Sequence, residues 1–143
     1  MSGPARCGGH SACKKMEPVV KIDLAERIRS GTPIVLELGC GLAPQPGRIG
    51  IDRLDLKGVD IVADIEQGLP FIPSGCVDQI FCRSLLEHVD NFELFMREAV
   101  RVLKAGGVCN VFVPHFSNPY YYSDYTHRRF FGLYTFYYFV AEN

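Results

Sequence analysis

The chain has 143 residues, of which 48% are hydrophobic and 22% are charged, and its formal net charge is −1. This composition is typical of one compact globular domain. A charge so close to zero argues against a protein that binds nucleic acid through the field of the whole molecule, although it leaves a local basic groove open.

The N-terminal segment is predicted to be a flexible leader over residues 1–16, followed by one domain over residues 17–143. Cys7, His10 and Cys13 have the spacing of metal ligands. They supply only three ligands in a Gly/Ser-rich stretch, so a flexible tail is favoured and no metal site is predicted. The remaining cysteines lie in or beside predicted strands without a secretory leader, which predicts reduced thiols and a cytoplasmic protein; they are Cys40, Cys76, Cys82 and Cys109.

Hydrophobic periodicity predicts helices and strands that alternate along the domain. A first helix is expected over residues 18–29. An amphipathic helix is expected to carry Phe92, Phe95, Met96, Ala99 and Leu103 on one face. Asp90 and Glu93 are expected to be its capping pair. Its exit is expected at residues 106–107, and a last helix is predicted over residues 133–140. Strands are predicted near residues 34–38, 49–52, 60–63, 77–82 and 108–113.

The most informative segment is VLELGCG, residues 35–41. Its apolar residues predict a strand buried on both faces, and Gly39 and Gly41 allow a sharp turn close to a ligand. Glu37 interrupts this strand near its carboxyl end, where open parallel sheets bind ligands. A Gly-x-Gly turn is a weak signal by itself, and a purely structural strand-to-loop turn is an equal alternative.

The residues after the glycines discriminate between cofactors. Pro44 and Pro46 leave no room for a regular helix before the next strand, so the loop offers no helix N-terminus to a pyrophosphate. A ligand without phosphate is favoured. Asp52 ends the second strand, where an acid usually binds ribose hydroxyls, and Asp64 ends the third, where a turn or cap is the structural alternative.

Taken in order, these segments resemble a known enzyme family. The segments are similar to the motifs of class I S-adenosylmethionine-dependent methyltransferases; they are ELGCGLA, GID, VADIEQGLPF, DQIFCRSLLEHV and RVLKAGGVCNVFVPH. They resemble in particular the small type 11-like members of that class, which share the LEH segment and a later Asp-x-Thr-His-x-Arg-x-Phe segment. The similarity spans roughly residues 33–132. It implies an α/β fold with a Rossmann-like, open, mostly parallel sheet and flanking helices, apparently truncated after the fifth strand. It also implies S-adenosyl-L-methionine as cofactor and methyl transfer by in-line displacement to an unidentified, small-molecule acceptor.

The resemblance assigns roles residue by residue. The glycine turn would hold the methionine end of the cofactor, with Ala43 where the family often has a third glycine. The second strand end would bind the ribose, the third would meet the adenine, and the end of the fourth would form the floor beneath the sulfonium. The implied cofactor-binding residues are Glu37, Gly39, Cys40, Gly41, Asp52, Arg53, Asp64, Ile65, Arg83, Ser84 and Leu85.

Acceptor-binding residues are expected on two loops. Glu87 and His88 follow the fourth strand and are predicted to line the site, the alternative being a loop cap and a packed polar residue. Tyr122 and Arg128 are further candidates on the loop after the fifth strand.

The same later loop carries the candidate bases. His127, oriented by Asp124, is the first candidate for a base that removes a proton from the acceptor, and His115 is the second. Closure of this loop for purely structural reasons is an almost equal alternative.

The C-terminal segment holds twelve of the seventeen aromatic residues, between Phe116 and Phe139. The fifth strand would have an open edge, so we expect a homodimer through residues 120–140 or a tail folded over that edge. The apolar run is too short to span a bilayer. Two other functions remain open: an inactive cofactor-binding remnant or subunit that needs a partner, and, less favoured, a nicotinamide-dependent oxidoreductase.

Overall fold

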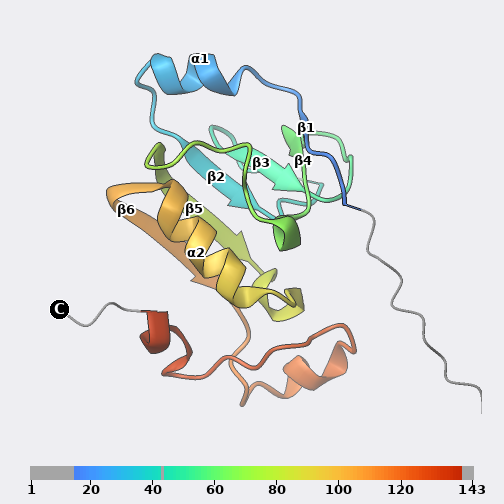
Figure 1. Cartoon of the computed structure of the whole chain (residues 1–143). Coiled ribbons are helices and arrows are strands. Elements are labelled where there is room, and N and C mark those ends of the chain that lie inside the picture. Colours follow the sequence, from blue (N-terminus) through green and yellow to red (C-terminus); the bar gives the residue numbers. More distant parts are fainter. Residues whose placement is uncertain (1–14, 43, 140–143) are drawn as a thin grey trace, which may run out of the picture.

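The computed structural model describes residues 15–42 and 44–139. Their sheet has six strands in the order β1-β4-β3-β2-β5-β6, in which only β1 runs antiparallel to its neighbour (Figure 1). This confirms the open, mostly parallel α/β sheet. The strands are β1 Val19–Val20, β2 Val35–Leu38, β3 Ile49–Asp52, β4 Ile61–Val62, β5 Val77–Arg83 and β6 Leu103–Phe112.

Two α-helices accompany the sheet, α1 (Leu24–Arg29) and α2 (Phe92–Val102). The predicted stripe of α2 is confirmed for Phe92, Phe95 and Ala99, which are buried where the helix packs against the sheet, and Met96 is partly buried beside them (Figure 1). Leu103 does not belong to this stripe, because it is the first residue of β6. Four 3₁₀ turns complete the described structure: η1 Ile65–Gln67, η2 Leu86–His88, η3 Pro119–Ser123 and η4 Thr135–Phe139.

Several predicted boundaries were wrong. The expected helix over residues 18–29 begins only at Leu24, because Val19–Val20 pairs with β4 as an edge strand. The side chain of Asn91, not the pair Asp90 and Glu93, caps α2 by accepting from the Leu94 amide.

The two later helix ends also differ. α2 stops at Val102, since Leu103 already pairs with β5, and residues 106–107 lie inside β6. The predicted helix over residues 133–140 is the 3₁₀ turn η4, and Val140 lies outside the described residues.

The strand register aligns the carboxyl ends of the central strands. Leu38 pairs with Ile51 of β3 and with Cys82 of β5, and all three side chains are buried. The residues that follow these pairs therefore emerge at one edge of the sheet: Gly39 after β2, Asp52 at the end of β3, and Ser84 after β5. This edge is where ligands bind in open α/β sheets.

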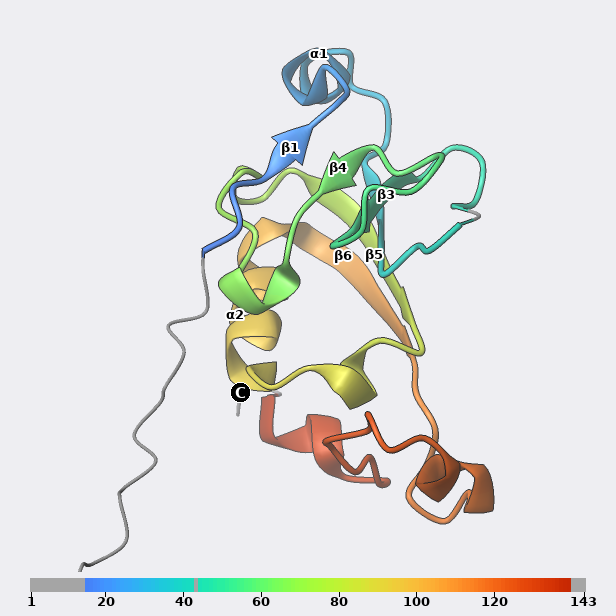
Figure 2. The same ribbon diagram turned by 90° about the vertical axis from the view of Figure 1, so that its right-hand side faces the viewer.

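The C-terminal aromatic segment folds back beneath this edge (Figure 2). Phe131 is buried and meets the ring of Phe92 edge-on, with 5.6 Å between centroids, and Phe136 and Phe139 contact the same ring. The segment thus covers the start of α2 rather than the outer side of β6, which has no strand partner within residues 15–42 and 44–139. Dimerisation stays a prediction.

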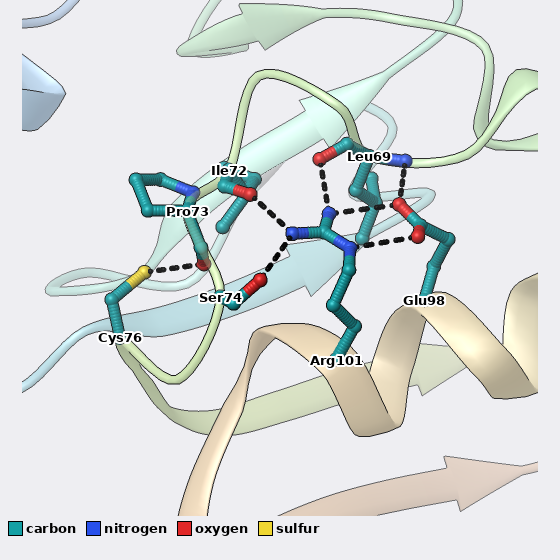
Figure 3. A network of polar contacts seen from close by, with 7 residues as sticks. All are labelled: Leu69, Ile72, Pro73, Ser74, Cys76, Glu98 and Arg101. Carbon is teal, nitrogen blue, oxygen red and sulfur yellow. Dashed lines mark hydrogen bonds and ion pairs between the residues drawn. The ribbon is translucent and has the colours of Figure 1, made fainter.

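A polar network joins α2 to the loop before β5 (Figure 3). Arg101 donates two hydrogen bonds to the Glu98 carboxylate and also bonds the carbonyls of Leu69 and Ile72, at 2.8–2.9 Å. Glu98 in turn accepts from the Leu69 amide. The network therefore satisfies backbone groups of a loop that has no regular structure of its own.

Candidate functional site

Three adjoining clefts lie along the carboxyl edge of the sheet. The first cleft, about 440 Å³, is bounded by the ends of β2, β3, β4 and β5. The second cleft, about 530 Å³, lies between the end of β5 and the loop after β6. The third cleft, about 460 Å³, lies beside β2 and β5. Ser84 and His88 line both the first and the second cleft, and Gly39 lines both the first and the third.

The backbone of the glycine turn after β2 lies close to the side chain of Leu85. Gly39 has φ +68°, and a Cβ there would lie 2.9 Å from a methyl carbon of Leu85 across the first cleft. Gly41 also has positive φ, and its amide donates to the Asp52 carboxylate at 2.9 Å. The described residues between β2 and β3 form turns but no helix, as predicted. Ala43 lies outside the described residues.

Glu37 lies in the third cleft, not the first. Its carboxylate accepts from the Gln45 amide at 2.8 Å and lies 3.7 Å from the Arg48 guanidinium, which is stacked on the Phe81 ring. Arg83 lines the second and third clefts. Glu37 therefore anchors the loop between β2 and β3 as well as lining a cleft.

The first cleft combines carboxylates with apolar walls. Asp52 accepts from two loop amides, those of Gly41 and Leu54, and Asp64 caps η1 by accepting from the Glu66 amide. Each carboxylate oxygen can accept a further hydrogen bond. The predicted cofactor residues that the structure brings together in this cleft are Gly39, Asp52, Arg53, Asp64, Ile65, Ser84 and Leu85.

Ser84 marks the point where the first and second clefts meet. It is the only described non-glycine residue with positive φ, at 49°. Its amide donates to the Phe112 carbonyl of β6, which ties the turn after β5 to the neighbouring strand. A non-glycine residue held in the left-handed region costs free energy, and such positions concentrate at functional sites.

The second cleft forms because residues 124–129 dock onto residues 85–90. The Arg128 amide donates to the Glu87 carbonyl at 2.7 Å, and its guanidinium pairs with Asp90. Arg129 bonds the Asp90 carbonyl and lies over the Phe92 ring. This docking brings His127 beside His88, with 4.9 Å between ring centroids.

Both histidines are held through Nδ1. His127 Nδ1 lies 2.8 Å from the Tyr121 carbonyl, which can only accept, so Nδ1 carries the proton and Nε2 faces away with a free lone pair. His88 Nδ1 lies 3.0 Å from Thr126 Oγ1, whose own proton is donated to Asp124. The hydroxyl and the amide of Thr126 both donate to the Asp124 carboxylate, and these two hydrogen bonds are the main cause that lowers the pKa of Asp124.

This geometry changes the role expected for Asp124. Its carboxylate lies 3.7 Å from His127 Nε2, too far for a hydrogen bond. The Tyr121 carbonyl orients His127 instead, and Asp124 acts through Thr126 on His88. The sequence contains Thr126 within the Asp-x-Thr-His pattern, but residue type alone does not predict which hydrogen-bond partners the backbone and hydroxyl groups of this docked loop will have.

Four predicted site residues line none of the three clefts: His115, Tyr122, Cys40 and Gly41. His115 is exposed and bonds Ser117, and the Tyr122 hydroxyl donates to the Phe116 carbonyl. Burial, followed by the nearby charges of Asp52 and Glu37, raises the pKa of Cys40 to about 11, which keeps its thiol protonated.

Other lining residues were missed by sequence reasoning. Glu66 lines the first cleft and accepts from the amides of Asp90 and Asn91, which anchors the start of α2 beside the site. Tyr121 lines the second cleft. Glu66 follows Asp64 by two residues, which is a usable signal, whereas nothing distinguishes Tyr121 from its neighbours Tyr120 and Tyr122 in the sequence.

Comparisons with known proteins agree with this arrangement. A SAM-dependent methyltransferase from Archaeoglobus fulgidus superposes with a TM-score of 0.63 at 19% identity, and the YcgJ protein from Bacillus subtilis with 0.59 at 19%. Each alignment covers 80% of this chain but 64% of the other, so the chain spans less than two thirds of these structures. No curated protein matches the sequence.

The described part of the chain contains no helix that is long and apolar enough to cross a membrane.

The family model described as a methyltransferase domain matches residues 38–111, just over half of the 143 residues, and covers the strands from the end of β2 to β6 that form the clefts. The solved structure from Archaeoglobus fulgidus is described as SAM-dependent, and with the family match this implies S-adenosylmethionine as the cofactor. The matched residues include the glycine turn after β2 and the parallel strands whose carboxyl ends form the clefts. The chain therefore belongs to the methyltransferase domain family.

Proposed function

We propose that the protein is an S-adenosylmethionine-dependent methyltransferase that holds its cofactor in the first cleft and a small-molecule acceptor in the second. The observation that carries this proposal is the wall shared by the two clefts, formed by Ser84 directly after β5 and by His88 at the end of η2. In-line methyl transfer requires donor and acceptor to meet at one point in a fixed alignment, and adjoining clefts supply such a point.

The first cleft suits this cofactor in shape and charge. Asp52 and Asp64 offer acceptors for ribose and adenine donors, and Ile65 with Leu85 offers apolar surface to a flat ring. Gly39 lets the turn approach a ligand where a side chain would collide with Leu85. When bound, S-adenosylmethionine supplies a methyl group activated by a cationic sulfur. The cleft is lined by three acids, Asp52, Asp64 and Glu66, and by two arginines, Arg53 and Arg128, so its small negative charge favours that cation only weakly.

The second cleft supplies the group that would remove a proton from the acceptor. His127 Nε2 is a free imidazole nitrogen in this cleft, because Nδ1 is engaged by the Tyr121 carbonyl. Thr126 and Asp124 hold His88 at the shared wall. An acceptor that loses a proton on methylation would pass it to His127, whereas one that needs no base would require only alignment. His115 and Tyr122 have no part in this proposal.

Binding of the product cofactor tests the first cleft. Titration calorimetry of the full chain with S-adenosylhomocysteine should give saturable binding at one site, and NAD should give none, since the loop after Gly41 offers no helix N-terminus to a pyrophosphate. Binding of NAD without binding of S-adenosylhomocysteine would contradict the proposal.

A screen of small-molecule acceptors with methyl-labelled cofactor tests the reaction itself. Transfer of label that disappears when His127 is replaced by alanine supports the proton-accepting role, and transfer that persists at the parental rate contradicts it. Cofactor binding without transfer to any acceptor class would favour the inactive cofactor-binding remnant.

A further inference from the structure

Glu87 is buried at the second cleft in an unusual state. It lies in η2 with 2% of its surface exposed, and its Oε2 has no hydrogen-bond partner among the described residues. The buried hydroxyl of Tyr121, which lines the same cleft, donates to the Arg129 carbonyl instead. A buried carboxylate oxygen without a partner is costly. The Nε of Arg129 is also buried without a hydrogen-bond partner, but no ion pair joins it to Glu87 among the described residues, so Glu87 Oε2 is open to a cation or donor from outside the chain.

Two imidazoles stand beside this carboxylate. One ligand atom each from Glu87, His88 and His127 lie within 4.8 Å of one another. The Nδ1 atoms of both rings face oxygens of Tyr121 and Thr126, which leaves each Nε2 as the unengaged nitrogen. Metal-binding histidines are typically held in this way, with the second ring nitrogen bonded to a carbonyl or another oxygen that fixes the tautomer.

We propose that Glu87, His88 and His127 bind a divalent transition-metal ion of the zinc class. Two neutral imidazoles and one carboxylate are a donor set that such ions accept, and three protein ligands leave a coordination position open. Zinc ligands at about 2.0–2.2 Å from the ion lie about 3.3 Å apart, so the three side chains must close by roughly 1.5 Å or less. The ion satisfies the Oε2 atom that the chain leaves without a partner.

The site goes beyond the proposed methyl transfer and does not require it. Its three ligand residues all line the second cleft, where a bound ion would coordinate an oxygen, nitrogen or sulfur of the acceptor and polarise it. In the loaded protein His127 is then a ligand, and its role as a proton acceptor applies to the metal-free chain. The ligand class that fits is a small molecule with an anionic or readily ionised heteroatom.

The experiment is a titration of the full, metal-stripped chain with Co²⁺, followed by visible absorption and by displacement with Zn²⁺. We expect one ion per chain at micromolar or lower free metal. Glu87→Gln, which keeps the shape and removes the charge, and His127→Gln should each weaken binding at least tenfold. His115→Gln, at an exposed histidine outside the cluster, should bind as the parent does. Circular dichroism identifies any variant that fails to fold, and the other variant then decides.

Cys7, His10 and Cys13 are competing metal ligands near the N-terminus, and a further variant removes the two thiols among them. A Cys7→Ser/Cys13→Ser variant should keep full cobalt binding without a thiolate charge-transfer band. Loss of binding in this variant would overturn the proposal, as would equal binding by Glu87→Gln, His127→Gln and the parent, or no binding at all. Calorimetry with S-adenosylhomocysteine on the same samples reports the first cleft separately, so failure of the metal site is distinguishable from failure of the cofactor site.

Discussion

Replacement of Gly39 by valine separates steric contact from backbone strain at the glycine turn. Gly39 and Gly41 both have positive φ, at +68° and +59°. A Cβ at Gly39 would lie 2.9 Å from a Leu85 methyl carbon, whereas a Cβ at Gly41 would meet nothing within 4 Å. Gly41→Val is therefore a matched control that carries the same conformational penalty without the collision.

The expected magnitudes follow from this difference. A side chain in the left-handed region costs about 1–2 kcal/mol at either position. Gly39→Val adds overpacking of about 1–3 kcal/mol, because Leu85 must move. Leu85 lines the first cleft, so its displacement should also weaken S-adenosylhomocysteine binding by roughly tenfold or more beyond the effect of Gly41→Val.

Urea unfolding without ligand and calorimetry with S-adenosylhomocysteine measure the two effects. In a double variant, Leu85→Ala should restore part of the stability lost in Gly39→Val, since the smaller side chain leaves room for the valine. Equal loss of stability and affinity in Gly39→Val and Gly41→Val would refute the steric reasoning, as would the absence of any coupling between Gly39 and Leu85.

Two further predictions concern the Arg101 network and the ribose site. Arg101→Met should destabilise the chain by about 2–3 kcal/mol in urea unfolding, since it removes charged hydrogen bonds from Glu98 and loop carbonyls (Figure 3), while Arg97→Met on the exposed face of the same helix should change little. The hydrogen bonds from Arg101 lower the pKa of Glu98 below its ordinary 4.5, so this stabilisation is complete above pH 4.5 and is lost as the pH falls through the lowered value; a gap between parent and Arg101→Met that widens in acid would contradict this sign. Asp52→Ala should weaken S-adenosylhomocysteine binding by about 1.5–3 kcal/mol in calorimetry, and parental affinity would show that Asp52 does not bind the ribose.

Much of the fold is local and was readable from the sequence. The central strands β2, β3 and β5 were predicted within a residue or two, because each is a short buried run bounded by turn residues. The buried stripe of α2 follows from its helical spacing. The glycine turn and the lack of a helix after Gly41 follow from the conformational freedom of glycine and the restrictions of proline, which are properties of single residues.

The tertiary structure decided whatever depends on a distant partner. Val19–Val20 becomes a strand, and the strand β6 begins directly at Leu103, because β4 and β5 offer them hydrogen-bonding edges that no local pattern reveals. Glu87 and His127 are forty residues apart in the chain and meet only because residues 124–129 dock onto residues 85–90. The sequence thus determined the strands, the turn and the family, since these are encoded in short windows. The depth at which Glu87 is buried and the partners of each imidazole depend on loop packing, whose free energy is shared among many long-range contacts.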